Sequence, residues 1–210
     1  MTNQIMPRAG AGCGALFAVA LFAASNGSAD ASYVAGLAAI ALFLPFLAYL
    51  CSLLHEAEGE HGWLAPAALA AGVAGITIKL GSVAPEIAAN HLAAGAMHNA
   101  LQDIANTATV ISMYPLALLF AAVATIALRT RVLPRWLAYG AAVTAAALAV
   151  NAGFIHATIV PAFLLFALWT LAASVVLFAK ARSRAVHITP CPAPAAGQRP
   201  AADNSLPAHR

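Results

Sequence analysis

ALRTRVLPRWL, at residues 127–137, is the stretch that decides the fold, because it separates two long apolar segments by only a few residues. A connection this short forces the flanking segments to run antiparallel, as a helical hairpin. Its three arginines mark the side of a membrane, since basic residues beside apolar spans stay in the cytoplasm. A second basic cluster, Lys180, Arg182 and Arg184, follows the last apolar segment. The pattern predicts a multi-pass helical membrane protein.

The composition excludes a soluble domain. Hydrophobic residues make up 62% of the 210 residues and charged residues 8%, whereas soluble domains average about 45–50% and about 25%. The net charge of +3 comes from residues that flank the spans, and no basic face with interleaved aromatic residues exists, which excludes nucleic-acid binding. Cys13, Cys51 and Cys191 form no CxxC pair, so a disulfide framework is not expected.

Six apolar segments have lengths near the about 20 residues that a spanning helix needs. We therefore predict an all-α integral membrane helical bundle with six transmembrane helices, in which residues 1–182 form one transmembrane domain. Residues 183–210 are rich in Pro, Ala and polar residues, which predicts a disordered cytoplasmic tail. The predicted spans cover about residues 9–25, 32–54, 63–81, 104–128, 134–155 and 158–180.

Both termini are predicted to be cytoplasmic, because the opposite orientation would export both basic clusters. The first segment also has the layout of a secretory signal peptide, with Arg8, an apolar stretch over residues 10–24 and small residues behind it. Cleavage and an uncleaved first helix both stay open, and the orientation of the later spans is the same in either case.

Residues 82–103 are less apolar than the spans around them. The run from Ser82 to Glu86, which contains Pro85, predicts a break in the third helix. From Ile87 onward we expect an amphipathic helix on the outer face that continues into the fourth span. Its polar stripe follows helical spacing and consists of His91, His98, Gln102, Asn106 and Thr109.

Three histidines, His91, His98 and His156, are expected at the outer face, near Glu86 and Asp103. Imidazole and carboxylate groups bind zinc or copper, so these residues are a candidate metal site. On one straight helix His91 and His98 would lie about 10 Å apart, too far to share an ion. One of them could instead join His156, if the fold brings the two together. The simpler interpretation is a solvated polar rim, and the prediction for cofactors is none, with zinc or copper as the alternative.

Lys79 is the basic residue that falls within an apolar span. An ion inside a membrane suggests a functional role, but a lysine near a helix end also extends its ammonium to the interface. The second interpretation directs Lys79 toward Glu86 or Asp103. Polar residues of the fourth span, such as Asn106 and Ser112, are expected to form hydrogen bonds between helices.

Four segments resemble a group of small, uncharacterised actinobacterial multi-spanning membrane proteins: AEGEHGWL at 57–64, LQDIAN at 101–106, YPL at 114–116, and ALRTRVLPRWL at 127–137. The resemblance covers roughly residues 50–180, and the run A-L-R-T-x-V-L-P-R-W-L is its most specific part. The group is similar to a wider bacterial membrane family of unknown function. The resemblance implies a helical bundle in a bacterial inner (plasma) membrane, and it supplies no activity and no catalytic residues.

Motifs for nucleotide binding, serine hydrolysis and zinc proteolysis are missing from the sequence. The leading hypothesis is a non-enzymatic accessory, sensor or assembly protein, with the lipid bilayer and a membrane protein or a second copy as partners. One alternative is a small transporter or channel subunit. The other is a membrane enzyme or metal-dependent redox protein that uses the outer-face histidines.

Overall fold

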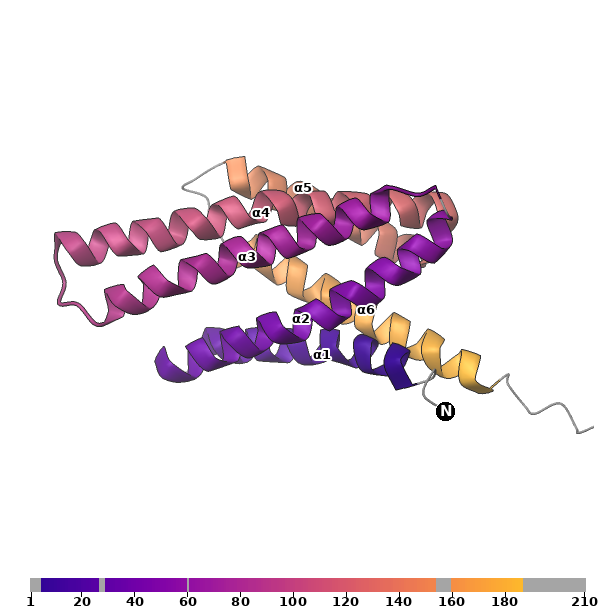
Figure 1. The fold of residues 1–210 in the computed structure, drawn as a ribbon, viewed down its shortest axis with the longest axis horizontal. Coiled ribbons are helices and arrows are strands. Elements are labelled where there is room, and N and C mark those ends of the chain that lie inside the picture. Colours follow the sequence, from indigo (N-terminus) through magenta and orange to yellow (C-terminus); the bar gives the residue numbers. More distant parts are fainter. Residues whose placement is uncertain (1–4, 27–28, 60, 154–159, 187–210) are drawn as a thin grey trace, which may run out of the picture.

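The chain folds into helices throughout the part that the structure describes. The structure is a computed structural model and describes residues 5–26, 29–59, 61–153 and 160–186. These residues contain six helices and no strand, which confirms the predicted all-α bundle (Figure 1). The helices are α1 (Ile5–Asn26), α2 (Ala29–Glu58), α3 (Leu64–Asn90), α4 (Ala96–Thr130), α5 (Arg135–Gly153) and α6 (Val160–Val186).

Five helices are long and apolar enough to cross a membrane, one each from α2 to α6. The matching segment of α1, Gly12–Ala24, is shorter, so its predicted role as a sixth span stays a prediction. The first four residues of the predicted tail, 183–186, belong to α6, and residues 187–210 lie outside the described residues. Large apolar side chains such as Phe22, Leu118 and Leu168 lie exposed on the outside of the bundle, as expected for surfaces that face lipid.

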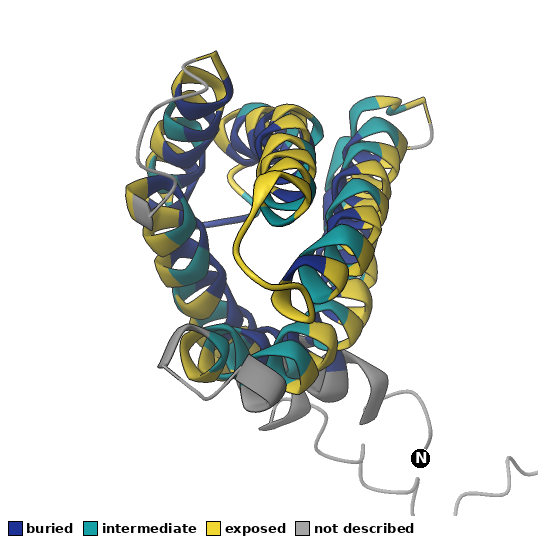
Figure 2. Ribbon diagram, turned by 90° about the vertical axis from the view of Figure 1, so that its left-hand side faces the viewer, coloured by how far each residue is buried: buried dark blue, intermediate teal, exposed yellow. Residues whose placement is uncertain are grey.

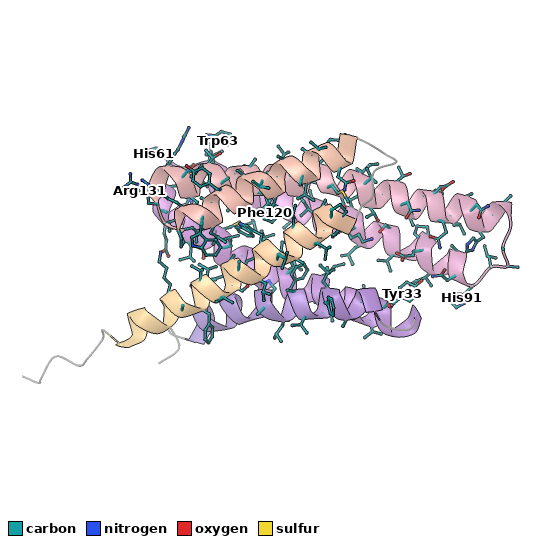
Figure 3. The ribbon with its side chains drawn as sticks, turned by 180° about the vertical axis from the view of Figure 1, so that it is seen from behind. Tyr33, His61, Trp63, His91, Phe120 and Arg131 are labelled. Carbon is teal, nitrogen blue, oxygen red and sulfur yellow. The ribbon has the colours of Figure 1, made fainter. Side chains whose placement is uncertain are left out.

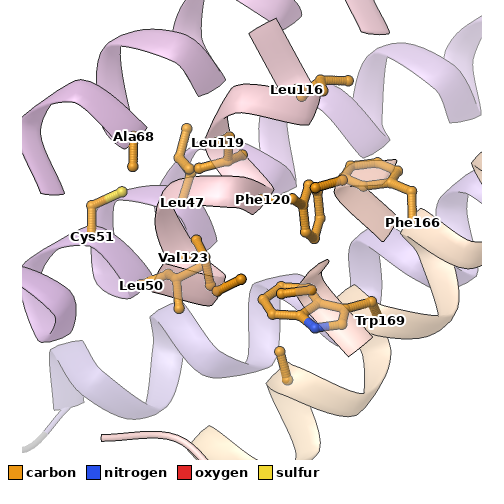
Figure 4. Close-up of a cluster of buried hydrophobic side chains, with 14 of the residues drawn as sticks. Leu47, Leu50, Cys51, Ala68, Leu116, Leu119, Phe120, Val123, Phe166 and Trp169 are labelled. Carbon is orange, nitrogen blue, oxygen red and sulfur yellow. The ribbon is translucent and has the colours of Figure 1, made fainter. Parts of the chain in front are cut away.

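The helices form two groups that meet along α2 and α6. Helix α4 packs against α3 and α5, while α1 packs against α2 and α6; α2 also contacts α3 and α4, and α6 contacts α5. Buried faces point inward in both groups (Figure 2). The core between them contains Leu47, Leu119, Phe120 and Trp169 (Figure 4). The Trp169 indole joins α6 to α5, because its Nε1 donates to the Leu137 carbonyl at 2.8 Å.

The predicted break in the third helix is wrong. Helix α3 continues through Pro85 to Asn90, and a turn at residues 91–95 precedes α4. Ser82 is fully buried, and its hydroxyl donates to the Lys79 carbonyl at 2.7 Å. Membrane helices tolerate an internal proline when neighbouring groups and helices support the backbone. The outer amphipathic helix predicted from Ile87 is therefore wrong as well, since Ile87 belongs to α3.

The α3–α4 hairpin extends beyond the other helices at one end of the molecule (Figure 1), which we call the hairpin end. The opposite end, called the basic end, holds both basic clusters. Lys180 Nζ donates to the Val132 carbonyl at 2.6 Å, so α6 is tied to the α4–α5 turn there. That turn is as tight as predicted: Arg131 adopts the left-handed conformation, with φ of 55°, and its N–H donates to the Ala127 carbonyl.

Glu58 organises the connection between α2 and α3 at the basic end. Its two carboxylate oxygens accept hydrogen bonds from the backbone N–H groups of Leu64, at 3.1 Å, and Ala65, at 2.9 Å. A carboxylate at the first turn of a helix satisfies free N–H groups and complements the helix dipole. The acidic connection therefore acts as a cap for α3.

Candidate functional site

A cavity of about 380 Å³ lies between the two groups of helices. Its walls come from α1, α2, α3, α4 and α6. This volume falls within the about 300–1,000 Å³ of pockets that hold small molecules. The cavity is a binding-site candidate because it combines apolar walls with a few polar side chains.

One face of α3 supplies both charged groups of the cavity lining. Ile76, Lys79, Val83, Glu86 and Asn90 all line the cavity and follow one another at steps of three or four residues, which places them on one helix face. In chain order, Ile76 precedes Lys79, and Val83 lies between Lys79 and Glu86. Helix α3 therefore gives the cavity a cation, a carboxylate and an amide along a single stripe.

The inner part of the cavity is aromatic. The rings of Phe17, Phe43 and Phe166 come from α1, α2 and α6, and all three residues line the cavity. Their centroids lie 5.0 Å apart for Phe17–Phe43, 5.4 Å for Phe17–Phe166 and 5.5 Å for Phe43–Phe166. These distances fall in the range of attractive ring pairs, so the three helices enclose an apolar surface of fixed shape.

Lys79 lies half-buried in the cavity wall. Its Nζ donates to Thr109 Oγ1 on α4 at 2.9 Å, and that hydroxyl donates in turn to the Ala105 carbonyl at 2.9 Å. Glu86 is the charged group that interacts electrostatically with Lys79. The ammonium thus lies inside a spanning helix, oriented by a neighbouring helix. An ion in such a position is costly, which makes Lys79 a candidate functional residue.

Side chains of three helices meet at the hairpin end of the cavity. Asn90 on α3 donates from Nδ2 to the Tyr33 hydroxyl on α2, and its Oδ1 accepts from Gln102 Nε2 on α4 at 3.4 Å. Tyr33 and Asn90 line the cavity, and Figure 3 shows Tyr33 at the opposite end of the molecule from Arg131. We call Tyr33, Asn90 and Gln102 the mouth cluster.

The structure places two of the three predicted metal ligands at the hairpin end. His91 is exposed at the C-terminal cap of α3, and His98 lies across the turn in the first turns of α4. His98 Nδ1 lies 2.8 Å from the Ala89 carbonyl, which can only accept, so Nδ1 carries the proton. His156 lies outside the described residues. Among the residues that the structure describes, no three His, Cys, Asp or Glu residues are placed to hold a metal ion, and the full set of ligands remains a prediction.

The sequence identified Lys79 and Glu86 but missed Tyr33 and Asn90. A signal for Asn90 existed, because it continues the helical spacing of Lys79 and Glu86. It was overlooked because a helix break was assumed at Pro85. For Tyr33 the sequence holds no comparable signal, since its partner lies 57 residues away.

Comparison with known proteins adds no relative from which a role could be transferred. No protein-family model, no curated protein and no solved structure matches the chain.

Proposed function

We propose that this chain is a non-enzymatic binding protein of a bacterial inner membrane, and that its cavity takes up a small amphipathic molecule as a sensor or accessory protein would. The observation that carries the proposal is the cavity itself, in which Lys79 and Glu86 share a wall with apolar side chains. Such a lining suits recognition, because apolar walls supply affinity and a few polar groups fix orientation.

The positions of the basic clusters indicate which end of the cavity lies toward which side of the membrane. The Lys180–Val132 hydrogen bond and Arg131 lie at the basic end, which the positive-inside rule assigns to the cytoplasm. The mouth cluster lies at the other end. In this orientation the cavity takes its ligand from the outer side of the membrane.

A glycine in the cavity wall offers a test that leaves the fold intact. Gly36 lines the cavity, and a Cβ added there would meet no atom within 4 Å. The substitution Gly36→Leu should therefore fill the cavity without a backbone clash. Gly81→Leu is the matched control, since Gly81 on α3 also has open space around it but lies outside the cavity lining.

The experiment uses the full chain in lipid nanodiscs and measures its thermal unfolding with three probes: leucine, 4-methylpentanoate and 3-methylbutylamine. A ligand at a hundred times its Kd stabilises the folded state by about 2.7 kcal/mol. We expect at least one probe to stabilise the wild type and the Gly81→Leu control, and none to stabilise Gly36→Leu. Absence of any shift in the wild type, or an unchanged shift in Gly36→Leu, would overturn the proposal.

A carrier for the same ligand is the second candidate, favoured by the location of the cavity between the two helix groups. A carrier would alternate access by moving one group against the other. The Lys79→Ala variant would then abolish uptake into proteoliposomes without affecting membrane insertion. Ligand binding without uptake would restrict the role to binding.

A further inference from the structure

Two opposite charges share the cavity wall. Lys79 and Glu86 lie on the same face of α3 and two turns apart, which is about 10 Å along the axis. Both residues belong to the described part of the chain, and they interact electrostatically without forming a direct ion pair. The Lys79 ammonium has three protons, of which Thr109 accepts one. Both charged groups therefore have hydrogen-bonding capacity left for a ligand between them.

Charge balance limits what can occupy this position. Lys79 and Glu86 give the cavity lining one positive and one negative charge. A ligand with a net charge would leave one ion uncompensated in apolar surroundings, which is costly. A ligand with one anionic and one cationic group pairs both side chains. Its anion would face Lys79 and its cation would face Glu86.

Geometry limits the distance between the two ligand charges. The backbone positions of Lys79 and Glu86 lie about 10 Å apart along the helix axis. Each charge-assisted hydrogen bond to a ligand takes up about 2.7–2.9 Å, so a ligand that bonds both side chains needs two charged groups close to each other. A carboxylate and an ammonium joined through one carbon atom meet this requirement. This arrangement is found in α-amino acids.

The opposite walls of the cavity determine which side chain the ligand can have. Leu37 and Ile40 on α2, Leu21 on α1 and Phe163 on α6 line the cavity together with the aromatic rings at its inner part. These surfaces are apolar and leave a polar side chain without partners, at a cost for each unpaired group. They favour a branched or aromatic apolar side chain.

We infer that the cavity binds a free α-amino acid with an apolar side chain, its carboxylate at Lys79 and its ammonium at Glu86. This inference rests on the proposed function and names the class of ligand. It goes beyond binding as such, because it assigns a separate partner in the protein to each charge of the ligand.

The first test compares three ligands on the wild-type protein in nanodiscs, by calorimetric titration. 4-Methylpentanoate is leucine without its ammonium, and 3-methylbutylamine is leucine without its carboxylate. We expect leucine to bind at least about tenfold more tightly than either, because each truncated ligand leaves one charge of the cavity wall unpaired. Equal affinity of 4-methylpentanoate or 3-methylbutylamine would overturn the inference and leave the proposed function standing. Absence of binding by all three would overturn both.

The second test changes the partner of the ammonium. Glu86→Gln should weaken leucine binding at least about tenfold while affecting 4-methylpentanoate little, so that the preference for leucine disappears. Asp103→Asn is the matched control, since Asp103 is an exposed carboxylate of α4 near the same end of the molecule and is not among the residues lining the cavity. A preference for leucine that survives in Glu86→Gln would contradict the assignment of the ammonium to Glu86.

Discussion

At the scale of single residues, one hydroxyl determines how the membrane-embedded ammonium is held. Thr109 is buried, accepts from Lys79 Nζ and donates to the backbone of its own helix. Ser112, one turn further along, donates to the Thr109 carbonyl at 2.6 Å. The charge on α3 is therefore supported by side chains of α4, and the α3–α4 contact depends on polar as well as apolar groups.

Replacing Thr109 by Val should destabilise the protein by about 1–3 kcal/mol, because Lys79 then loses its acceptor. Thr109→Ser keeps the hydroxyl and is the control, expected close to the wild type. The measurement is the free energy of unfolding in detergent. In a Lys79→Met background the Thr109→Val cost should shrink, since the interaction is already missing. An equal cost in both backgrounds would show that the valine acts through packing alone.

Lys79 could be identified as a candidate functional residue from the sequence, but the side chains that contact it could not all be predicted. Lys79 stands out because a basic residue within an apolar span is rare. The sequence directs Lys79 toward Glu86 or Asp103, and Glu86 does interact electrostatically with Lys79. The hydrogen bond from Lys79 to Thr109 was not predicted. Residues share a helix face by periodicity, but which two faces meet depends on tertiary packing.

At the scale of the helices, close approach depends on glycines at particular contacts. A Cβ on Gly72 of α3 would lie 2.6 Å from Leu47 Cδ2 of α2, and Leu47 is fully buried. Small residues allow membrane helices to pack closely where no hydrophobic driving force exists between them and lipid. This contact connects α2 to α3 and helps to fix the distance between the two helix groups.

Gly72→Ala should destabilise the protein by about 1–3 kcal/mol, because the methyl group overpacks the α2–α3 contact. Gly81→Ala, two and a half turns along the same helix in open space, should be neutral or stabilising through its higher helix propensity. Denaturant unfolding in detergent compares the two variants. If both alanines have the same effect, the close α2–α3 approach is not what sets the stability.

Helix positions followed from the sequence more reliably than helix ends. The tight turn at Arg131 and the five spans from α2 to α6 agree with apolar length and with the basic clusters. The predicted end of α3 was wrong, because the prediction gave Pro85 the helix-breaking effect that proline usually has. Within a bundle, packing against α4 supports the helix through Pro85.

At the scale of the whole molecule, α4 is longer than a bilayer is thick. Its 35 residues span about 52 Å, against about 30 Å of hydrocarbon. The hairpin end therefore extends out of the apolar layer, and its turn is exposed (Figure 2). We expect the residues of this turn to be accessible from one side of the membrane only.

Cysteine labelling tests the direction of the bundle. In a background with Cys13, Cys51 and Cys191 replaced by Ala, Asn99→Cys should react with a membrane-impermeant maleimide added to intact spheroplasts, because Asn99 is exposed at the hairpin end. Arg131→Cys should react only after the membrane is opened. The reverse pattern would invert the predicted topology and place the mouth cluster in the cytoplasm.

The contribution of α6 to the cavity has a consequence for biosynthesis. A ribosome releases the helices in chain order, and Phe163 and Phe166 of the last one supply a wall of the cavity. A nascent chain that has inserted α1 to α5 lacks that wall and also lacks Lys180, which bonds to the α4–α5 turn. Under the proposed function, a chain could bind its ligand only after α6 has been synthesised and inserted. The proposed ligand would then stabilise chains that contain α6 over shorter nascent ones.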